Sequence, residues 1–139
     1  MKLIAQSEVD LAELALEIIE YAGARKIWLF HGTLGAGKTT LVKAIGKQLQ
    51  VIDSMSSPTY SIVNEYATEN GDVVYHIDCY RLKNEIEAMD IGMEEYLDAD
   101  KFCFIEWPEK ITSLWPDEYL RIEIVTDVQE ARIINITRV

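Results

Sequence analysis

One eight-residue stretch constrains this chain more than any other. Residues 32–39 read "GTLGAGKT" and lie between an apolar run, "KIWLF" at 26–30, and a segment with helical spacing. Glycines at positions 32, 35 and 37 permit backbone conformations that turn successive N–H groups toward one point. The stretch matches the pattern G-x-x-x-x-G-K-[ST] at every specified position, after a strand pattern and before a helix pattern. The sequence therefore predicts a phosphate-binding loop with a nucleoside triphosphate as its ligand.

Two side chains of this loop have predicted roles. We expect Lys38 to reach the β- and γ-phosphates and the hydroxyl of Thr39 to coordinate Mg²⁺. The positive end of the following helix adds to the attraction for phosphate. The N-K-x-D signature of guanine recognition does not occur in the sequence, which favours ATP and ADP over guanine nucleotides.

A phosphate loop also needs an acid on the magnesium side and a group that positions the attacking water. The strand pattern "KFCFIEW" at 101–107 contains Glu106, which would lie beside the loop and hold the metal through water. An ordinary acid at a strand exit is the alternative. A second candidate is Asp78, in the strand pattern "DVVYHIDCY" at 72–80. It would poise the attacking water or contact the metal shell, or else pair with Arg81.

Four further residues near these motifs are weaker candidates. Thr59, in the hydroxyl-rich loop "SSPTYS", would sense the γ-phosphate as switch-loop threonines do, or is an ordinary loop residue. We expect His31 to be a structural neighbour of the phosphate loop and His76 to pack within its strand. Trp107, directly after Glu106, is expected to be a packing residue.

The order of the predicted elements indicates the fold class. The sequence predicts a helix over 8–22 with Ser7 as its N-cap, a strand at 26–30, a helix from the loop to about residue 50, a hairpin of strands 60–67 and 72–80, one or two helices in 82–98 broken near Gly92, a strand at 101–107 stopped by Pro108, and an antiparallel pair at 119–125 and 131–139. This order predicts a three-layer α/β fold of the P-loop NTPase kind, with a mixed parallel and antiparallel central sheet. We expect one domain over residues 1–139.

Charge and cysteine content narrow the functional classes. The net charge of −11 makes the chain a poor lone binder of phosphate backbones, so nucleic acid would be met only through a partner protein. Cys79 and Cys103 form neither a metal-binding spacing nor a disulfide framework, and we expect buried free thiols. Neither a signal-peptide pattern nor an apolar run of roughly 20 residues occurs, so the expected location is the cytoplasm, with no membrane contact.

Several separated motifs together resemble one family. The segments "GTLGAGKTTLV", "SPTYSIVNEY", "VVYHIDCYRL", "IGMEEYLD" and "FIEWPEK" occur in the order and spacing of the TsaE family, over roughly residues 7 to 135. TsaE proteins are small bacterial P-loop ATPases of tRNA threonylcarbamoyladenosine biosynthesis. The resemblance implies weak ATP hydrolysis in isolation and assembly with the TsaB–TsaD complex, which modifies the adenosine next to the anticodon. Hydrolysis would reset that complex between turnovers, and tRNA would be met only through it.

The resemblance also implies roles for individual residues. The family's nucleotide-binding positions fall on Thr33, Leu34, Gly35, Ala36, Gly37, Lys38, Thr39 and Thr40. Thr39 and Glu106 match the Mg²⁺ positions, and Lys38, Asp78 and Glu106 match the catalytic ones. Thr59 matches the switch threonine, and Trp107 the tryptophan after the acid. The segment near Ser7 and the loop "TDVQE" at 126–130 resemble places where the family holds the adenosine.

Two other functions use the same loop. A small-molecule P-loop kinase would clamp the transferred phosphoryl group with arginines in a mobile lid. The five arginines here are scattered, at positions 25, 81, 121, 132 and 138, without a lid-like insertion. A nucleotide-gated binding module would use ATP to order residues 56–61 and so set its affinity for a partner.

Overall fold

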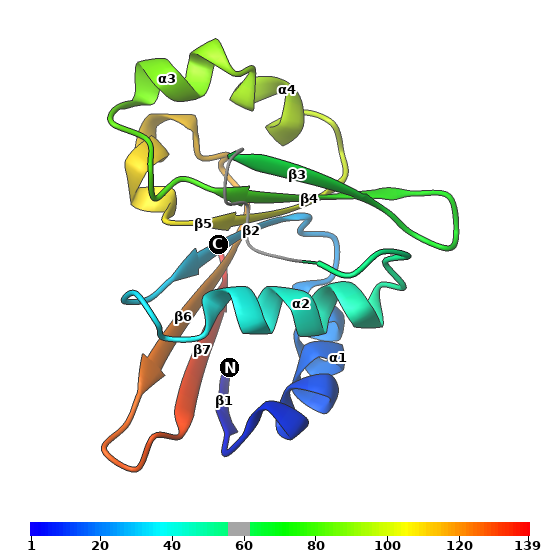
Figure 1. The fold of residues 1–139 in the computed structure, drawn as a ribbon, viewed down its shortest axis with the longest axis vertical. Helices are drawn as coiled ribbons and strands as arrows, with labels where there is room; N and C mark the ends of the chain where they lie inside the picture. Colours follow the sequence, from blue (N-terminus) through cyan, green and yellow to red (C-terminus); the bar gives the residue numbers. More distant parts are fainter. Residues whose placement is uncertain (56–61) are drawn as a thin grey trace.

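A seven-stranded mixed sheet organises the chain (Figure 1). The structure is a computed structural model that describes residues 1–55 and 62–139. The strands are β1 (Lys2–Ala5), β2 (Ile27–His31), β3 (Val63–Ala67), β4 (Val73–Asp78), β5 (Phe102–Glu106), β6 (Leu120–Thr126) and β7 (Arg132–Arg138). Their order across the sheet is β1-β7-β6-β2-β5-β4-β3.

The parallel part of the sheet positions the phosphate loop. Strand β2 pairs in parallel with both β6 and β5, and β5 pairs in parallel with β4. Carboxyl ends of parallel strands meet at one edge of a sheet, where ligands of open α/β sheets bind. The loop after β2 therefore emerges beside the ends of β4 and β5. The outer pairs β3–β4, β6–β7 and β1–β7 are antiparallel.

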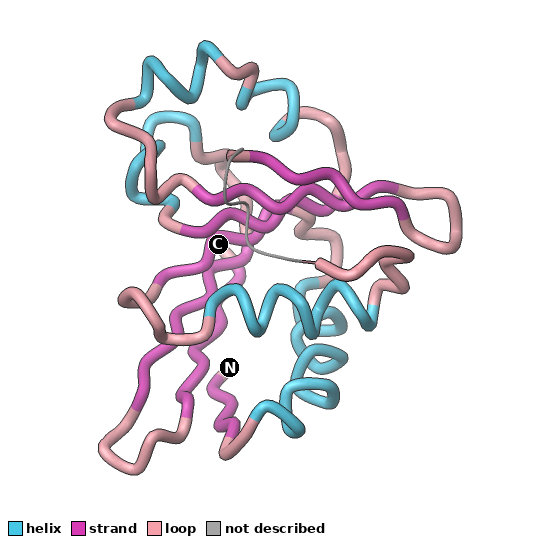
Figure 2. The backbone as a smooth tube through the Cα atoms, in the orientation of Figure 1, coloured by secondary structure: helices cyan, strands magenta, loops and turns pink. Residues whose placement is uncertain are grey.

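Helices cover both faces of the sheet (Figure 2). They are α1 (Leu11–Ala22), α2 (Lys38–Gln48), α3 (Glu85–Asp90) and α4 (Met93–Leu97), with short 3₁₀ helices η1 (Glu8–Asp10) and η2 (Pro108–Leu114). Helices α1 and α2 pack with Trp28, Phe30 and Phe104 on one face, whereas α3, α4 and η2 pack with Leu29 and Ile105 on the other. The strand "IWLF" is buried on both faces, which explains why it reads as a continuous apolar run.

The predicted fold class, a three-layer α/β protein with a mixed sheet, is confirmed. Each predicted helix and strand has a counterpart within a few residues, except that the start of the strand predicted at 60–67 lies outside the described residues. The 82–98 segment forms two helices, and Gly92 between them has a φ of 77°. Strand β1 and helix η2 were not predicted. The pairing of β1 with β7 gives four residues, of which only Ala5 is buried, their strand conformation.

Both cysteines are buried free thiols, as expected. Burial raises the pKa of the Cys79 thiol to about 12, and the pKa of Cys103 is raised by the same cause. Neither thiol is therefore ionised near neutral pH. Within residues 1–55 and 62–139, no helix has the length and apolar character needed to span a bilayer.

Helix α1 provides a matched test of this packing. Ile18 is fully buried against the sheet, whereas Leu16 on the same helix is 52% exposed. We expect Ile18→Ala to lower the free energy of unfolding by about 2–5 kcal/mol, because it leaves a cavity. Leu16→Ala should change it by no more than about 0.5 kcal/mol. Urea denaturation of both variants measures the difference, and equal effects would contradict the described burial of α1.

Candidate active site

The phosphate loop needs its glycines for two reasons: the backbone has positive φ values at Gly35 and Gly37, and neighbouring atoms leave little room for a Cβ atom at Gly32 and Gly37. Gly35 and Gly37 have φ values of 81° and 102°, in the left-handed region that disfavours other residues. A Cβ atom on Gly32 would lie 3.0 Å from the carbonyl oxygen of Ile124 in β6. A Cβ atom on Gly37 would lie 2.5 Å from Nε of Arg132 in β7. The loop therefore packs closely on the two strands that follow β5 in the sequence.

Lys38 is the first residue of α2, and its side chain folds back over the loop. It is 5% exposed, and its Nζ donates a hydrogen bond of 2.6 Å to the carbonyl oxygen of Gly32. The same Nζ lies 3.6 Å from the centroid of the Trp107 ring, a cation–π contact. Burial lowers the pKa of Lys38, and the neighbouring carboxylates, chiefly that of Glu106, oppose this shift. The ammonium group is thus held at the mouth of the loop by two neutral groups, a carbonyl oxygen and an aromatic ring.

Thr39, Glu106 and His76 form a hydrogen-bonded chain beside the loop. The hydroxyl of Thr39 lies 3.0 Å from each carboxylate oxygen of Glu106. Nε2 of His76 lies 2.5 Å from Oε2 of Glu106. Glu106 is 3% exposed and His76 is fully buried. The carboxylate at the end of β5 is therefore held between a side chain of α2 and a side chain of β4.

Asp78 lies next to Glu106 at the carboxyl end of β4. The two residues are partners in the parallel register, so their side chains project from the same face of the sheet. The backbone N–H of Tyr80 donates a 3.0 Å hydrogen bond to Oδ1 of Asp78. Burial raises the pKa of Asp78, and the negative charge of Glu106 adds to the increase, while the Tyr80 hydrogen bond opposes it. The site therefore brings two carboxylates together beside one lysine.

These oxygen donors fit Mg²⁺ bound together with a nucleotide. The Thr39 hydroxyl and the Glu106 and Asp78 carboxylates are the hard ligands that Mg²⁺ prefers. In the parts of the chain that the structure describes, no group of three or more His, Cys, Asp or Glu side chains is placed to hold a metal ion. Mg²⁺ in nucleotide sites commonly takes only one or two protein oxygens and completes its shell with water and phosphates. The donor set therefore suits a metal that arrives with its substrate.

Trp107 has a strained backbone conformation at this site. Its φ of 57° and ψ of 50° place a bulky side chain in the left-handed region, which costs about 1–3 kcal/mol. This conformation directs the indole over Lys38 and against Tyr80, with ring centroids 5.0 Å apart. The expectation that Trp107 packs is met, and the group it packs on is the lysine of the phosphate loop.

The phosphate loop opens into a cleft of about 270 Å³. It is lined by Leu34, Gly35, Gly37, Lys38, Thr39 and Thr40 from the loop and α2, and by Asp78, Tyr80, Glu106, Trp107 and Arg132 from other elements. Thr33 and Ala36 shape the loop from within, since the N–H of Ala36 donates to the carbonyl of Thr33 at 3.1 Å. The structure thus gathers most of the predicted site residues around one cleft.

Ser7 is a predicted site residue whose described position lies outside this cleft. Ser7 lies just before η1, where its N–H donates to a carboxylate oxygen of Asp10 at 3.3 Å, and it is not among the described residues that line the cleft. Its role with adenosine stays a prediction. Thr59 and the rest of "SSPTYS" fall outside the described residues.

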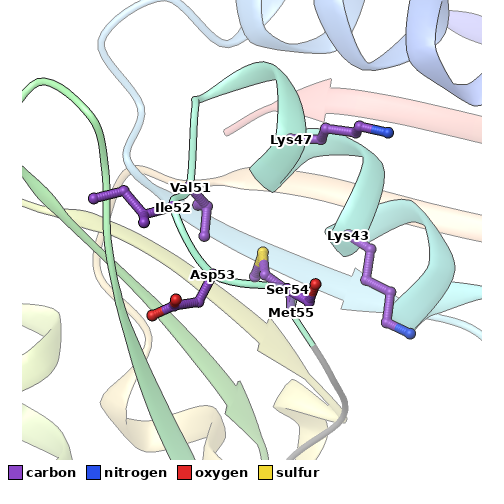
Figure 3. Close-up of a pocket in the computed structure, with 7 residues that line it drawn as sticks. All are labelled: Lys43, Lys47, Val51, Ile52, Asp53, Ser54 and Met55. Atoms are coloured by element: carbon purple, nitrogen blue, oxygen red, sulfur yellow. The ribbon is translucent and has the colours of Figure 1, made fainter.

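A second hollow, of about 360 Å³, lies along the opposite part of α2 (Figure 3). Lys43 and Lys47 extend from the helix beside it, and residues 51–55 complete the described lining. It shares no described lining residue with the cleft at the phosphate loop. The carboxylates and the threonine hydroxyl that suit a nucleotide–metal complex belong to the smaller hollow.

Among the described residues, the sequence reasoning missed three that touch the site: Tyr80, which lines the cleft, His76 and Arg132. His76 was expected only to pack within its strand, yet it contacts Glu106. The signal was present, because His76 and Asp78 are two apart in a strand and so share a face. Arg132 donates a 2.9 Å hydrogen bond from Nε to the carbonyl of Ala36. The two residues are 96 positions apart, and no local pattern marks the contact.

Comparison with known proteins agrees with this geometry. The family described as "Threonylcarbamoyl adenosine biosynthesis protein TsaE" matches residues 5–134. The tRNA threonylcarbamoyladenosine biosynthesis protein TsaE of Bacillus subtilis is 36% identical over 121 residues, which cover 86% of this chain and 73% of that protein. The TsaE protein of Aquifex aeolicus is 37% identical over 128 residues, which cover 91% of this chain and 89% of that protein.

A solved structure is similar as well. The crystal structure of Bacillus subtilis YdiB superposes with a TM-score of 0.77 at 27% identity, covering all of this chain and 85% of that one. The match therefore extends over the sheet, the helices and the segments that carry the cleft. A chain that matches the family over residues 5–134 and keeps this architecture belongs to the TsaE family.

Proposed function

We propose that this protein is a Mg²⁺-dependent ATPase of tRNA threonylcarbamoyladenosine biosynthesis, which hydrolyses ATP slowly as an accessory of the TsaB–TsaD complex. Membership of the TsaE family supports the pathway. The observation that carries the enzymatic part is the contact of the Thr39 hydroxyl with both oxygens of Glu106, at 3.0 Å, at the mouth of a glycine-rich loop. A hydroxyl and a buried acid in this position serve nucleotide–metal binding in P-loop NTPases.

The loop and Lys38 would bind the triphosphate. Within the part of the chain that the structure describes, Lys38 contacts a carbonyl oxygen and an aromatic ring, both neutral partners. A phosphate oxygen is a stronger partner for an ammonium group than either of these. Lys38 therefore exchanges these contacts for the β- and γ-phosphates when ATP enters. Before that, the Trp107 ring restricts the conformations of the Lys38 side chain. The N-terminus of α2, which begins at Lys38, adds its partial positive charge.

The two acidic residues, Glu106 and Asp78, would have separate roles in hydrolysis. Thr39 and Glu106 hold Mg²⁺, which when bound supplies charge neutralisation at the transferred phosphoryl group. His76 orients Glu106 by donating from Nε2 to Oε2. Asp78 would orient the attacking water, because it lies at the same edge of the sheet and, in residues 1–55 and 62–139, its carboxylate accepts a hydrogen bond from the backbone N–H of Tyr80.

The charge of the protein supports an indirect relation to tRNA. A net charge of −11 makes this protein repel a phosphate backbone. A basic surface on a partner protein would instead attract this protein. ATP hydrolysis would then reset the TsaB–TsaD complex between turnovers, with tRNA bound by the partners.

Lys38 is tested by comparison with a lysine on the same helix. We expect Lys38→Ala to weaken ADP binding at least about a hundredfold, because a buried charge-assisted contact to phosphate is lost. Lys43→Ala should bind ADP within about twofold of the wild type, since Lys43 is exposed and lines the other hollow. Isothermal titration calorimetry measures both affinities. Equal loss in the two variants would mean that Lys38 has no special role.

The two carboxylates are tested by turnover. We expect Glu106→Gln and Asp78→Asn each to lower ATP hydrolysis about a hundredfold or more, while ADP binding without Mg²⁺ stays within a few-fold of the wild type. Phosphate release is measured with the protein alone and with TsaB, TsaD and tRNA present. Full activity in both variants would remove these residues from catalysis. A wild-type protein without ATP hydrolysis in the complete mixture would overturn the proposed function itself.

Asp78 should also reduce the stability of the unliganded protein. Its folded-state pKa is raised above the unfolded value by burial, so ionising it costs free energy in the native state. This cost is present at pH 7 and disappears below the ordinary pKa of an aspartate, where the group is protonated in both states. We therefore expect Asp78→Asn to melt at a higher temperature than the wild type at pH 7, with the gap closing as the pH is lowered. Asp117→Asn, at an exposed position, is the calorimetric control, and an unchanged gap across this range would contradict the prediction.

A further inference from the structure

We propose that Arg132 is a positioning residue of the phosphate loop, which fixes the peptide between Ala36 and Gly37 and adds a second positive charge to the cleft. The inference rests on the proposed function, because it takes the ligand to be a nucleoside di- or triphosphate. It assigns a role in that site to the C-terminal hairpin formed by β6 and β7.

The contact between Arg132 and the loop is direct. Nε of Arg132 donates a 2.9 Å hydrogen bond to the carbonyl oxygen of Ala36. The side chain also closes over Gly37, where an added Cβ atom would lie 2.5 Å from Nε and 3.0 Å from Cδ. The absence of a side chain at Gly37 is therefore what allows the guanidinium to reach the backbone.

This hydrogen bond determines where one amide of the loop points. A peptide unit is planar, and in the trans form its C=O and N–H groups point in opposite directions. Every peptide bond that the structure describes is trans. Because Arg132 holds the Ala36 oxygen on its own side, the N–H of Gly37 faces the other way. Backbone N–H groups that face the centre of such a loop are the ones that bind phosphate oxygens.

Arg132 is well placed to hold this orientation because it belongs to a strand. It is the first residue of β7 and pairs with Ala5 of β1 on one side and Thr126 of β6 on the other. A side chain on a paired strand is positioned more accurately than one on a loop. The donor is therefore in place before a ligand arrives.

The charge of Arg132 matters in a cleft that also contains acids. Among the described residues that line the cleft, two are cationic, Lys38 and Arg132, and two carry carboxylates, Asp78 and Glu106. Without Arg132 the fixed side-chain charge there would be net negative, in a protein whose total is −11. An arginine carries five N–H donors, and Ala36 accepts from the one on Nε. The two terminal nitrogens carry the other four and suit phosphate oxygens.

The test compares Arg132 with Arg138, which lies on the same strand and over the Tyr21 ring, 4.6 Å from its centroid. We expect Arg132→Gln to weaken ADP binding about ten- to a hundredfold by calorimetry. Arg132→Lys should recover part of the loss, because it restores the charge without the planar fork. Arg138→Gln should bind within about twofold of the wild type. The melting temperature of unliganded Arg132→Gln should stay close to that of Arg138→Gln.

A second measurement reports on the loop itself. In ¹⁵N-labelled protein without nucleotide, the amide resonance of Gly37 should move in Arg132→Gln and keep its place in Arg138→Gln. Unchanged ADP affinity, or an unmoved Gly37 amide, in Arg132→Gln would overturn the inference. If Arg132→Gln does not fold, the test uses Arg132→Lys. An ADP affinity and a Gly37 amide resonance equal to those of the wild type in Arg132→Lys would then overturn the inference. A wild-type protein that binds no ADP would instead contradict the proposed function, and the Gly37 comparison would still test Arg132.

Discussion

The hydroxyl of Thr39, shared between the two oxygens of Glu106, joins the two halves of this site. Thr39 belongs to the first turn of α2, and Glu106 is the last residue of β5. The contact exists because β5 lies beside β2 in parallel, which brings the end of one strand next to the loop that leaves the other. The order of the strands thus brings a threonine hydroxyl and a buried acid together, although the two residues are 67 positions apart in the sequence.

The same arrangement places several groups that destabilise the folded state close together. Glu106 and Lys38 are buried charged groups, Asp78 lies next to Glu106, and Trp107 has a left-handed backbone conformation. Each of these features costs stability in the absence of a ligand. The aromatic and aliphatic core on both sides of β2 offsets that cost. Buried charges and a strained tryptophan gathered at one cleft are typical of a site that is organised for a ligand.

Local patterns predicted most of the fold and the centre of the site. The apolar run of β2 and the alternation in β6 and β7 are properties of neighbouring residues, and each predicted a strand that the structure contains. The glycines of residues 32–39 predicted the turn between β2 and α2, and the binding of a nucleotide there stays a prediction. Strand β1 was not predicted, because only Ala5 among its residues is buried and its extended conformation depends on pairing with β7. Arg132 escaped for a related reason, since its contact with Ala36 depends on how the last hairpin packs against the loop. The position of His76 could have been predicted, because residues two apart in a strand lie on the same face and His76 is two residues before Asp78.

The sheet order has a consequence for how the protein matures during synthesis. Strand β7 inserts between β6 and β1, and the N-terminal amine of Met1 donates to the carbonyl of Ile136 at 2.8 Å. The first and last strands described here are therefore neighbours, and β7 leaves the ribosome after the other elements described here. Non-local pairings of this kind form late. A nascent chain can complete β2 and the glycine loop early, but it receives the guanidinium that supports this loop only after more than ninety further residues have been added.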